Sequence, residues 1–287
     1  MAPRSRQGFS LVEMLIALVL LGLVSVLLYG VLSTAQRLSR TQAQQTLMSG
    51  NMRTGELLAP YELRQINISP AGVSDIRAMG PDSITYRAMR GNGVACSITA
   101  TEVRVLTSTW YAYRNPVAGR DTLLVFLEVD PNLTADDQWV ALPISSVNMS
   151  STCGARGAIA FGTLINVLTY PLTSFLPTGV TEAPMRTFET MQLKLMSSGG
   201  QYFLGARSVS NGDALAEAVG PLAASGFRLA FYDSTGAATT NVGRVRTVDI
   251  VVTALSDGLV RASASSNLTT LQDSMTTSVS LRNVPRR

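Results

Sequence analysis

Glu13 has the most unusual chemical setting in this chain, because its carboxylate stands at the start of a strongly apolar run. Residues 14–32 contain no charged side chain and are dominated by Leu, Val, Ile, Ala and Met. A charged group inside such a segment is costly and tends to be kept where it has a partner or a task. We therefore expect Glu13 to have a specific electrostatic role.

The chain contains no histidine, which removes most hydrolytic and metal chemistry. A Ser-His-Asp triad, a Cys-His pair and a histidine-based zinc site are all impossible. The single lysine, Lys194, follows Met191 at the spacing where a Ser-x-x-Lys nucleophile would need serine, and two cysteines cannot form a four-thiolate zinc site. We expect a protein that is not an enzyme and that has neither a metal nor a cofactor.

Two short motifs invite a ligand interpretation but favour a simpler one. Residues 130–137 contain three Asp and one Asn, the oxygen ligands that calcium prefers, but their spacing is not that of a recognised calcium loop. Gly91-Asn92-Gly93 lacks the third glycine and the strand-to-helix context of a dinucleotide site. We interpret the first as a solvated turn and the second as a hairpin turn.

Trp110, Tyr111 and Tyr113 form the densest aromatic cluster of the sequence. They could form a binding surface, but side chains alternate between the two faces of a strand, so some of them must point inward. This favours core packing.

The element that positions Glu13 is a membrane segment. As a helix, residues 14–32 can cross a hydrocarbon core about 30 Å thick. The basic Arg4 and Arg6 precede this run and should remain cytoplasmic, so that the rest of the chain is exported. The formal net charge of +4 includes Arg4 and Arg6, and the +2 that remains without residues 1–8 is too small to indicate nucleic-acid binding.

Cys96 and Cys153, the two cysteines, would both lie in the exported part, where disulfides persist. We expect them to be bridged. Two separate buried thiols are the alternative, and a redox site is a third reading, although no C-x-x-C motif occurs.

The stretch Gly8-Phe9-Ser10-Leu11-Val12-Glu13 resembles the type III signal of prepilins and pseudopilins. In that family a short basic leader ends in Gly, and a membrane-embedded aspartyl peptidase cuts after it and N-methylates the new terminal Phe. The resemblance implies removal of a leader, residues 1–8, by cleavage between Gly8 and Phe9, and methylation of Phe9. Cleavage would present a positive amine that the Glu13 carboxylate of a neighbouring subunit could pair with, which fixes the register between helices.

Two other interpretations of the N-terminal residues remain open. The apolar run followed by Ser33-Thr34-Ala35 could be an ordinary secretory signal cut after Ala35, or the run could be a plain signal anchor in which Glu13 is incidental. Neither explains why Gly8, Phe9 and Glu13 occur together.

Beyond Leu32 the sequence becomes more polar, but the helical pattern continues as far as Leu58. Pro60 then provides a stop. We predict one helix over residues 9–58, with a transmembrane part (9–32) and an amphipathic part (33–58). An apolar stripe on the second part should pack against the globular body. It consists of Leu38, Leu47, Met48, Met52 and Leu57.

Short strand-like runs separated by Gly, Asn, Asp and Pro predict a β-rich head over residues 61–287. Asp233-Ser234-Thr235-Gly236 suits a turn, and apolar residues alternate in 227–232 and 248–254. The predicted strands span 83–89, 94–99, 102–113, 122–129, 139–149, 158–168, 187–196, 201–209, 227–232, 245–255 and 277–284. The fold class is therefore α+β, a long N-terminal membrane-spanning helix and a mainly antiparallel head, with residues 171–184 as the candidate boundary between two subdomains.

The C-terminal residues 227–233 and 280–283 are similar to those of large minor pilins and J-type pseudopilins. The resemblance implies a minor pilin or pseudopilin in an initiating or tip complex of a type IV pilus or type II secretion pseudopilus. Its partners would be the prepilin peptidase, other pilins and the inner membrane, and its final place the filament. Nothing in the sequence indicates a DNA or surface ligand. The alternative is an exported β-sandwich binding module held by a membrane anchor.

Overall fold

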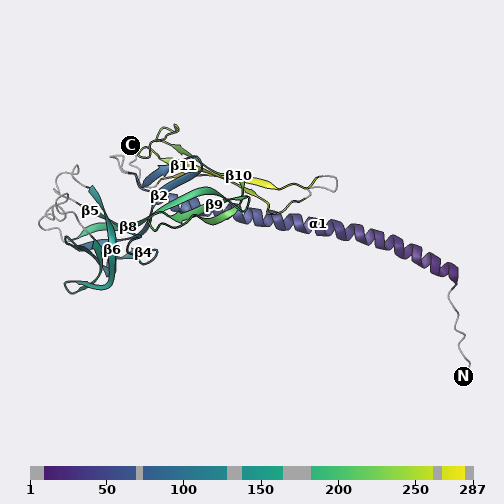
Figure 1. The fold of residues 1–287 in the computed structure, drawn as a ribbon, viewed down its shortest axis with the longest axis horizontal. Coiled ribbons are helices and arrows are strands. Elements are labelled where there is room, and N and C mark those ends of the chain that lie inside the picture. The colour runs from purple at the N-terminus through teal and green to yellow at the C-terminus, as the bar shows by residue number, and fades with distance from the viewer. Residues whose placement is uncertain (1–9, 69–73, 128–137, 164–181, 261–266, 282–287) are drawn as a thin grey trace, which may run out of the picture. The chain divides into compact units, whose positions relative to one another are not determined.

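The computed structural model describes residues 10–68, 74–127, 138–163, 182–260 and 267–281. The chain divides into two compact units, one formed by Met1–Gly50 and Leu255–Asp273 and the other by Asn51–Ala254 and Ser274–Arg287. Helix α1 (Leu11–Leu63) contributes to both. The described part therefore has the expected α+β organisation, one long helix followed by a mainly antiparallel sheet (Figure 1).

Helix α1 ends at Leu63 rather than near Leu58, although Pro60 lies inside its last turn. Proline removes one helical hydrogen-bond donor and favours a break. Here the turn is held because Ala59 and Leu63 are fully buried, and the carbonyl of Pro60 still accepts a hydrogen bond from the Arg64 N–H at 3.0 Å. Burial of the two apolar side chains outweighs the missing hydrogen bond.

The predicted apolar stripe of α1 is only partly correct. Met48 and Met52 are buried, but the three leucines of the stripe are exposed, namely Leu38, Leu47 and Leu57. The face that packs in the second unit uses small residues instead, because Gly55 and Ala59 follow Met52 at helical spacing. A Cβ on Gly55 would lie 3.3 Å from a methyl group of Val252, a tight contact that the Val252 side chain would have to relieve by a small shift.

The first unit consists of the N-terminal part of α1 and an arm formed by Leu255–Asp273. Val260 and Thr269 exchange two backbone hydrogen bonds of 2.9 Å across the arm. The Gly258 N–H donates to the Gln44 side-chain oxygen at 3.3 Å, which fastens the arm to the helix.

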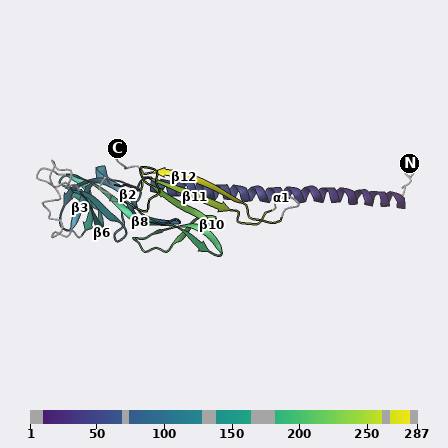
Figure 2. The same cartoon turned by 90° about the horizontal axis from the view of Figure 1, so that it is seen from above.

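The second unit contains a sheet in which consecutive neighbours are β1-β2-β3-β7-β6-β5-β8-β9-β10-β11-β12, with β4 paired to β2. Figure 2 labels several of these strands, among them β2, β8, β10 and β11. The strands are β1 (Ile76–Met79), β2 (Ser83–Ile98), β3 (Glu102–Leu106), β4 (Tyr111–Ala112), β5 (Thr122–Leu127), β6 (Gln138–Cys153), β7 (Arg156–Thr163), β8 (Ala183–Ser198), β9 (Gln201–Ser208), β10 (Ala216–Tyr232), β11 (Thr247–Leu255) and β12 (Gln272–Ser280). A short 3₁₀ turn, Thr107–Thr109, precedes β4.

Part of this sheet closes on itself. Strand β2 pairs with both β3 and β8, so that within the described residues six strands form a ring, β2-β3-β7-β6-β5-β8. Closure removes exposed strand edges. Its apolar core includes residues from every one of these strands, among them Ala95, Val105, Val125, Leu142, Phe161 and Met185.

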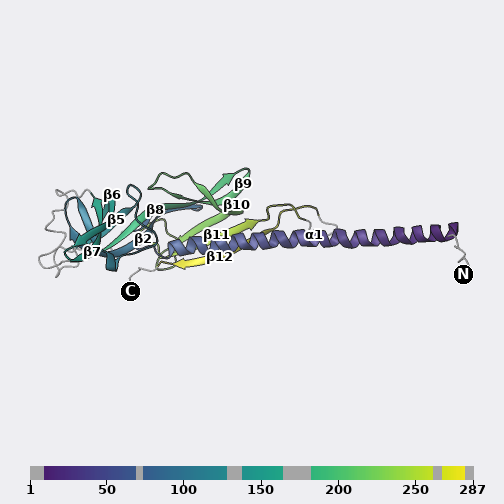
Figure 3. The same ribbon diagram turned by 90° about the horizontal axis from the view of Figure 1, so that it is seen from below.

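Outside this ring the sheet continues from the C-terminal half of β8 through β9 to β12, and the last turns of α1 pack on it (Figure 3). The Asn51 amide donates to the Gly220 carbonyl of β10 at 2.7 Å. The Thr277 hydroxyl of β12 donates to the Glu56 carboxylate at 3.2 Å. These bonds tie the end of the helix to the carboxy-terminal strands.

The predicted alternation is confirmed in β10, where Phe227, Leu229 and Phe231 are buried, and in β11. The turn at Asp233 is also confirmed, since Gly236 has a φ of +81° and the Asp233 N–H donates to the Ala237 carbonyl at 2.9 Å. The hairpin turn predicted at Gly91-Asn92-Gly93 is wrong, because these residues lie within β2.

Two further expectations fall largely on residues outside the described part of the chain. These are the calcium-like loop at 130–137 and most of the candidate subdomain boundary at 171–184. Strands β2 and β8 run through both the ring and the open part of the sheet.

Candidate assembly site and head pocket

Glu13 lies in the first turn of α1 and is exposed. Its carboxylate accepts a hydrogen bond from the Ser10 backbone N–H at 3.1 Å. This is one half of a capping box, in which a Glu at the third helical position reaches back to the N-cap residue. The spacing Ser10-x-x-Glu13 is readable in the sequence as that motif. Among the described residues Glu13 has no ion-pair partner.

The apolar first part of α1 has no partner within the described residues of the chain. Side chains such as Leu15, Leu20 and Leu27 are more than half exposed. By length and composition α1 is the one described helix that could cross a membrane. Gly8 and Phe9, the predicted cleavage pair, lie outside the described residues.

The two cysteines predicted to pair are joined. Cys96 near the end of β2 and Cys153 at the end of β6 form a disulfide with a Cα–Cα distance of 6.4 Å. The bond connects two strands of the ring that are separated in the sheet by β3 and β7.

The aromatic cluster divides between core and surface. Trp110 packs against Phe161 with ring centroids 5.5 Å apart, and it lies over Gly91 and Gly93 of β2. Tyr111 and Tyr113, in contrast, are 79% and 76% exposed. The expectation of core packing is therefore correct for Trp110 and wrong for the two tyrosines.

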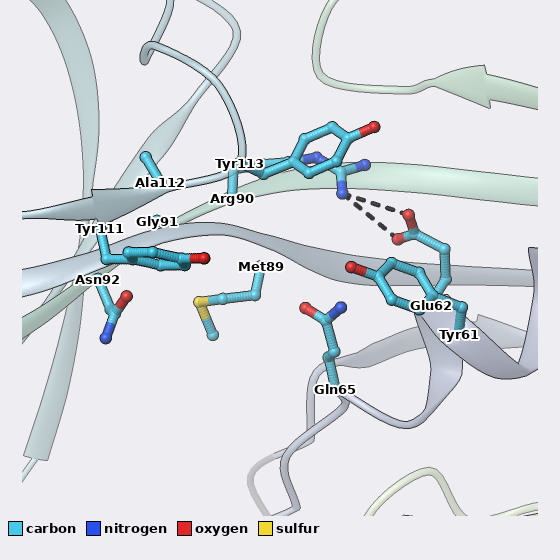
Figure 4. Close-up of a pocket in the computed structure, with 10 residues that line it drawn as sticks. All are labelled: Tyr61, Glu62, Gln65, Met89, Arg90, Gly91, Asn92, Tyr111, Ala112 and Tyr113. Atoms are coloured by element: carbon cyan, nitrogen blue, oxygen red, sulfur yellow. Dashed lines mark hydrogen bonds and ion pairs between the residues drawn. The ribbon is translucent and has the colours of Figure 1, made fainter.

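Tyr111 and Tyr113 help to form a pocket of about 440 Å³ between the end of α1 and strand β2 (Figure 4). We call it the tyrosine pocket. Its lining residues are Tyr61, Glu62, Gln65, Met89, Arg90, Gly91, Asn92, Tyr111, Ala112 and Tyr113. Sequence reasoning missed the contributions of α1, because the predicted helix ended before them.

A buried ion network lies behind one wall of this pocket. Glu189 of β8, only 1% exposed, accepts hydrogen bonds from Arg90 at 3.0 Å, Arg114 at 3.0 Å and Arg120 at 2.5 Å. Arg90 also pairs with Glu62 of α1 at 3.3 Å. The network therefore links α1, β2 and β8 with the segment between β4 and β5.

The network shifts the ionisation of its members. Burial alone would raise the pKa of Glu189, but hydrogen bonds from Arg120, Ser208, Arg90 and Arg114 lower it to about 2. Burial raises the pKa of Tyr86 well above its usual value, and the nearby Glu62 carboxylate adds to this. Glu189 is therefore an ionised member of a structural ion network, and Tyr86 stays neutral, so neither group is an acid or base poised near neutral pH.

The described residues contain no group of three or more His, Cys, Asp or Glu side chains that could hold a metal ion.

The N-terminal part of the chain is similar to a known family motif. Residues 3–29 match the prokaryotic N-terminal methylation motif. The match supports a type IV pilin- or pseudopilin-like protein that is processed by prepilin peptidase, and it suggests a structural subunit. Together with the apolar helix it supports membrane anchoring followed by pilus assembly. Comparison with curated proteins and with solved structures gave no significant match to this chain.

Proposed function

We propose that this chain is a minor pilin or pseudopilin, a structural subunit of an initiating or tip complex in a type IV pilus or type II secretion pseudopilus. The observation that carries the proposal is the methylation motif at the start of a helix whose apolar half is exposed among the described residues, while its other end is packed into a β-rich head. A bulky head of this kind fits the end of a filament better than a repeated position in its shaft.

Cleavage of the leader would create the charged amine that takes part in assembly. Prepilin peptidase would cut between Gly8 and Phe9 at the inner membrane and methylate the Phe9 amine, which then carries a positive charge in an apolar environment. Unpaired charges there are costly. The amine of one subunit and the Glu13 carboxylate of its neighbour would offset part of that cost and set the axial stagger of the two helices.

The present contacts of Glu13 support this role. Its only hydrogen bond among the described residues comes from the Ser10 N–H, so the carboxylate retains acceptor capacity for a cation from another molecule. A capping bond of this type contributes about 1 kcal/mol to the helix. Losing it should leave a helix of this length and apolarity intact.

The test compares wild type with Glu13→Val and with Glu13→Asp as the matched, charge-retaining control. Mass spectrometry of membrane-extracted protein should show a methylated Phe9 at the amino terminus in all three. Recovery in sheared filaments, or in co-purified complexes with other minor subunits, should fall at least about tenfold for Glu13→Val, the equivalent of about 1.4 kcal/mol, and less for Glu13→Asp.

Three outcomes would count against the proposal. A mature chain that starts at Gln36 would show an ordinary secretory signal. An uncleaved chain that stays in the membrane would show the alternative, an anchored binding module. Normal incorporation of Glu13→Val would overturn the register role of the carboxylate.

A further inference from the structure

The tyrosine pocket is built on a rigid frame. Strand β4 is fastened to β2 by backbone pairing of Tyr111 with Asn92, and the Tyr113 N–H donates to the Arg90 carbonyl at 2.8 Å. On one side of this segment Trp110 is anchored in the core, and on the other Arg114 forms two 2.6 Å hydrogen bonds to Asp121. A pre-organised site loses less entropy when it binds a ligand.

Several uncharged polar groups that line the pocket have no side-chain hydrogen-bond partner among the described residues. Within the described residues, the side-chain amides of Gln65 and Asn92 and the hydroxyls of Tyr61 and Tyr111 make no hydrogen bond. In Figure 4 the hydroxyls of Tyr61 and Tyr111 point toward one another above Met89, and the Gln65 amide points into the same space. Amides and hydroxyls both donate and accept, so the pocket suits a ligand that does the same.

The charged groups of the pocket, by comparison, already have partners. Arg90 is paired with Glu62 and with Glu189, and its guanidinium also lies 5.9 Å from the centroid of the Tyr113 ring. Among the described residues that line the pocket, no uncompensated charge of either sign is therefore present. A phosphate, a nucleic acid or an acidic peptide would find no cation to pair with, which favours a neutral ligand.

The apolar part of the pocket lining is mainly aromatic and thioether surface. The rings of Tyr61 and Tyr111 and the thioether side chain of Met89 offer flat, polarisable contact area at low entropic cost. A pyranose ring has C–H faces that pack on aromatic rings and a rim of hydroxyls that donate and accept hydrogen bonds. The volume of about 440 Å³ lies within the roughly 300–1,000 Å³ of small-molecule sites.

From this combination we propose that the tyrosine pocket binds a neutral saccharide of one or two rings. Tyr61 and Tyr111 would stack on the sugar, and Gln65 and Asn92 would hydrogen-bond to its hydroxyls. The proposal does not rest on filament incorporation, since binding is a property of the single chain.

The test uses the full-length chain in phospholipid nanodiscs, because detergents with sugar head groups would compete for the pocket. Saturation-transfer NMR is recorded with four neutral disaccharides, namely maltose, lactose, cellobiose and N,N′-diacetylchitobiose. At least one should bind with a Kd on the order of 1 mM, a value usual for a small site with few contacts.

Variants then locate the site. Tyr111→Ala and Tyr61→Ala should each weaken binding about tenfold, and Gln65→Ala somewhat less. Tyr202→Ala, which removes a partly exposed tyrosine of β9 outside the pocket, should leave binding unchanged. Circular dichroism of each variant checks that it is folded. Tyr111→Phe, which keeps the aromatic ring, should retain most of the affinity for the sugar.

Several results would overturn the proposal. One is the absence of transfer to all four disaccharides up to about 10 mM, where even weak sites are substantially occupied. Another is an equal loss of affinity in Tyr202→Ala. A third is Tyr111-dependent binding of oligothymidylate or hexaglutamate without any binding of sugar, which would assign the pocket to a charged macromolecule.

Discussion

At the scale of single residues, Glu13 and the two cysteines have chemical settings that need a physical reason. Glu13 is informative because a carboxylate at the edge of an apolar run needs a physical reason, and its bond to the Ser10 N–H shows a local one. Cys96 and Cys153 are informative because a chain with only two cysteines has a single possible intramolecular bridge.

The disulfide should contribute substantially to the stability of the head. The bridged residues are 57 positions apart, for which the chain-entropy treatment gives about 4 kcal/mol. We expect the double variant Cys96→Ser, Cys153→Ser to lower the free energy of unfolding by an amount of this order, measured by urea denaturation under matched conditions. Wild-type protein treated with reductant is the control and should lose a similar amount. Two titratable thiols in the native, exported protein would contradict the prediction.

At the scale of elements, β2 shows why two glycines that are typical of a turn can lie within a strand. Gly91-Asn92-Gly93 has the composition of a hairpin turn, yet it forms the middle of a strand because Trp110 lies against it. A Cβ on Gly91 would stand 2.7 Å from the Trp110 ring, and one on Gly93 would stand 2.8 Å from a Val105 methyl group. The glycines provide room for a side chain that is distant in sequence, which local pattern cannot reveal.

Gly91→Ala should therefore destabilise the head. Alanine normally suits a strand better than glycine, but here its methyl group would overlap the Trp110 ring and cost about 1–3 kcal/mol through displacement of packed groups. The shift of the urea midpoint measures the loss. Gly157→Ala in β7 is the matched control, because its Cβ would meet Thr107 at an ordinary 3.6 Å, and it should change stability by less than about 0.5 kcal/mol. Equal stability of the Gly91 variant and wild type would show that Trp110 can move aside without cost.

Contacts with segments distant in sequence also explain where α1 ends. A helical stripe and Pro60 predicted a stop near residue 58, but the helix continues because Ala59 and Leu63 are buried and Glu62 pairs with Arg90 of β2. Strand existence and the alternation in β10 and β11 followed from local pattern. The closure of the ring and the tyrosine pocket depend on contacts between distant segments, which composition and periodicity do not encode.

At the scale of the whole molecule, the Glu189 network is the contact that unites the head. It holds the last turn of α1, through Glu62 and Arg90, to the long strands β2 and β8 that the ring and the open sheet share. Glu189 is central because it is the acceptor for three guanidinium groups while almost completely buried. Removing one partner of such a group leaves buried charge uncompensated.

This arrangement predicts a specific sensitivity to acid. The pKa of Glu189 is about 2 in the folded head, below its ordinary value of 4.5. The stabilisation is therefore complete above about pH 4.5 and is lost as the pH falls through about 2, with an upper size of roughly 3 kcal/mol for a shift of this extent. Asp75 acts in the opposite direction, because burial raises its pKa and its protonation in acid favours the folded state.

A comparison of variants isolates the contribution of Glu189. The free energy of unfolding, measured in urea between about pH 7 and pH 2.5, should decline in acid more steeply for wild type than for Glu189→Gln, which should already be less stable near neutrality because its three arginines lose their carboxylate. Glu182→Gln, which removes an exposed ion pair with Arg156, should keep the wild-type slope. If wild type and Glu189→Gln showed parallel pH profiles, the network would not be the acid-labile contact of the head.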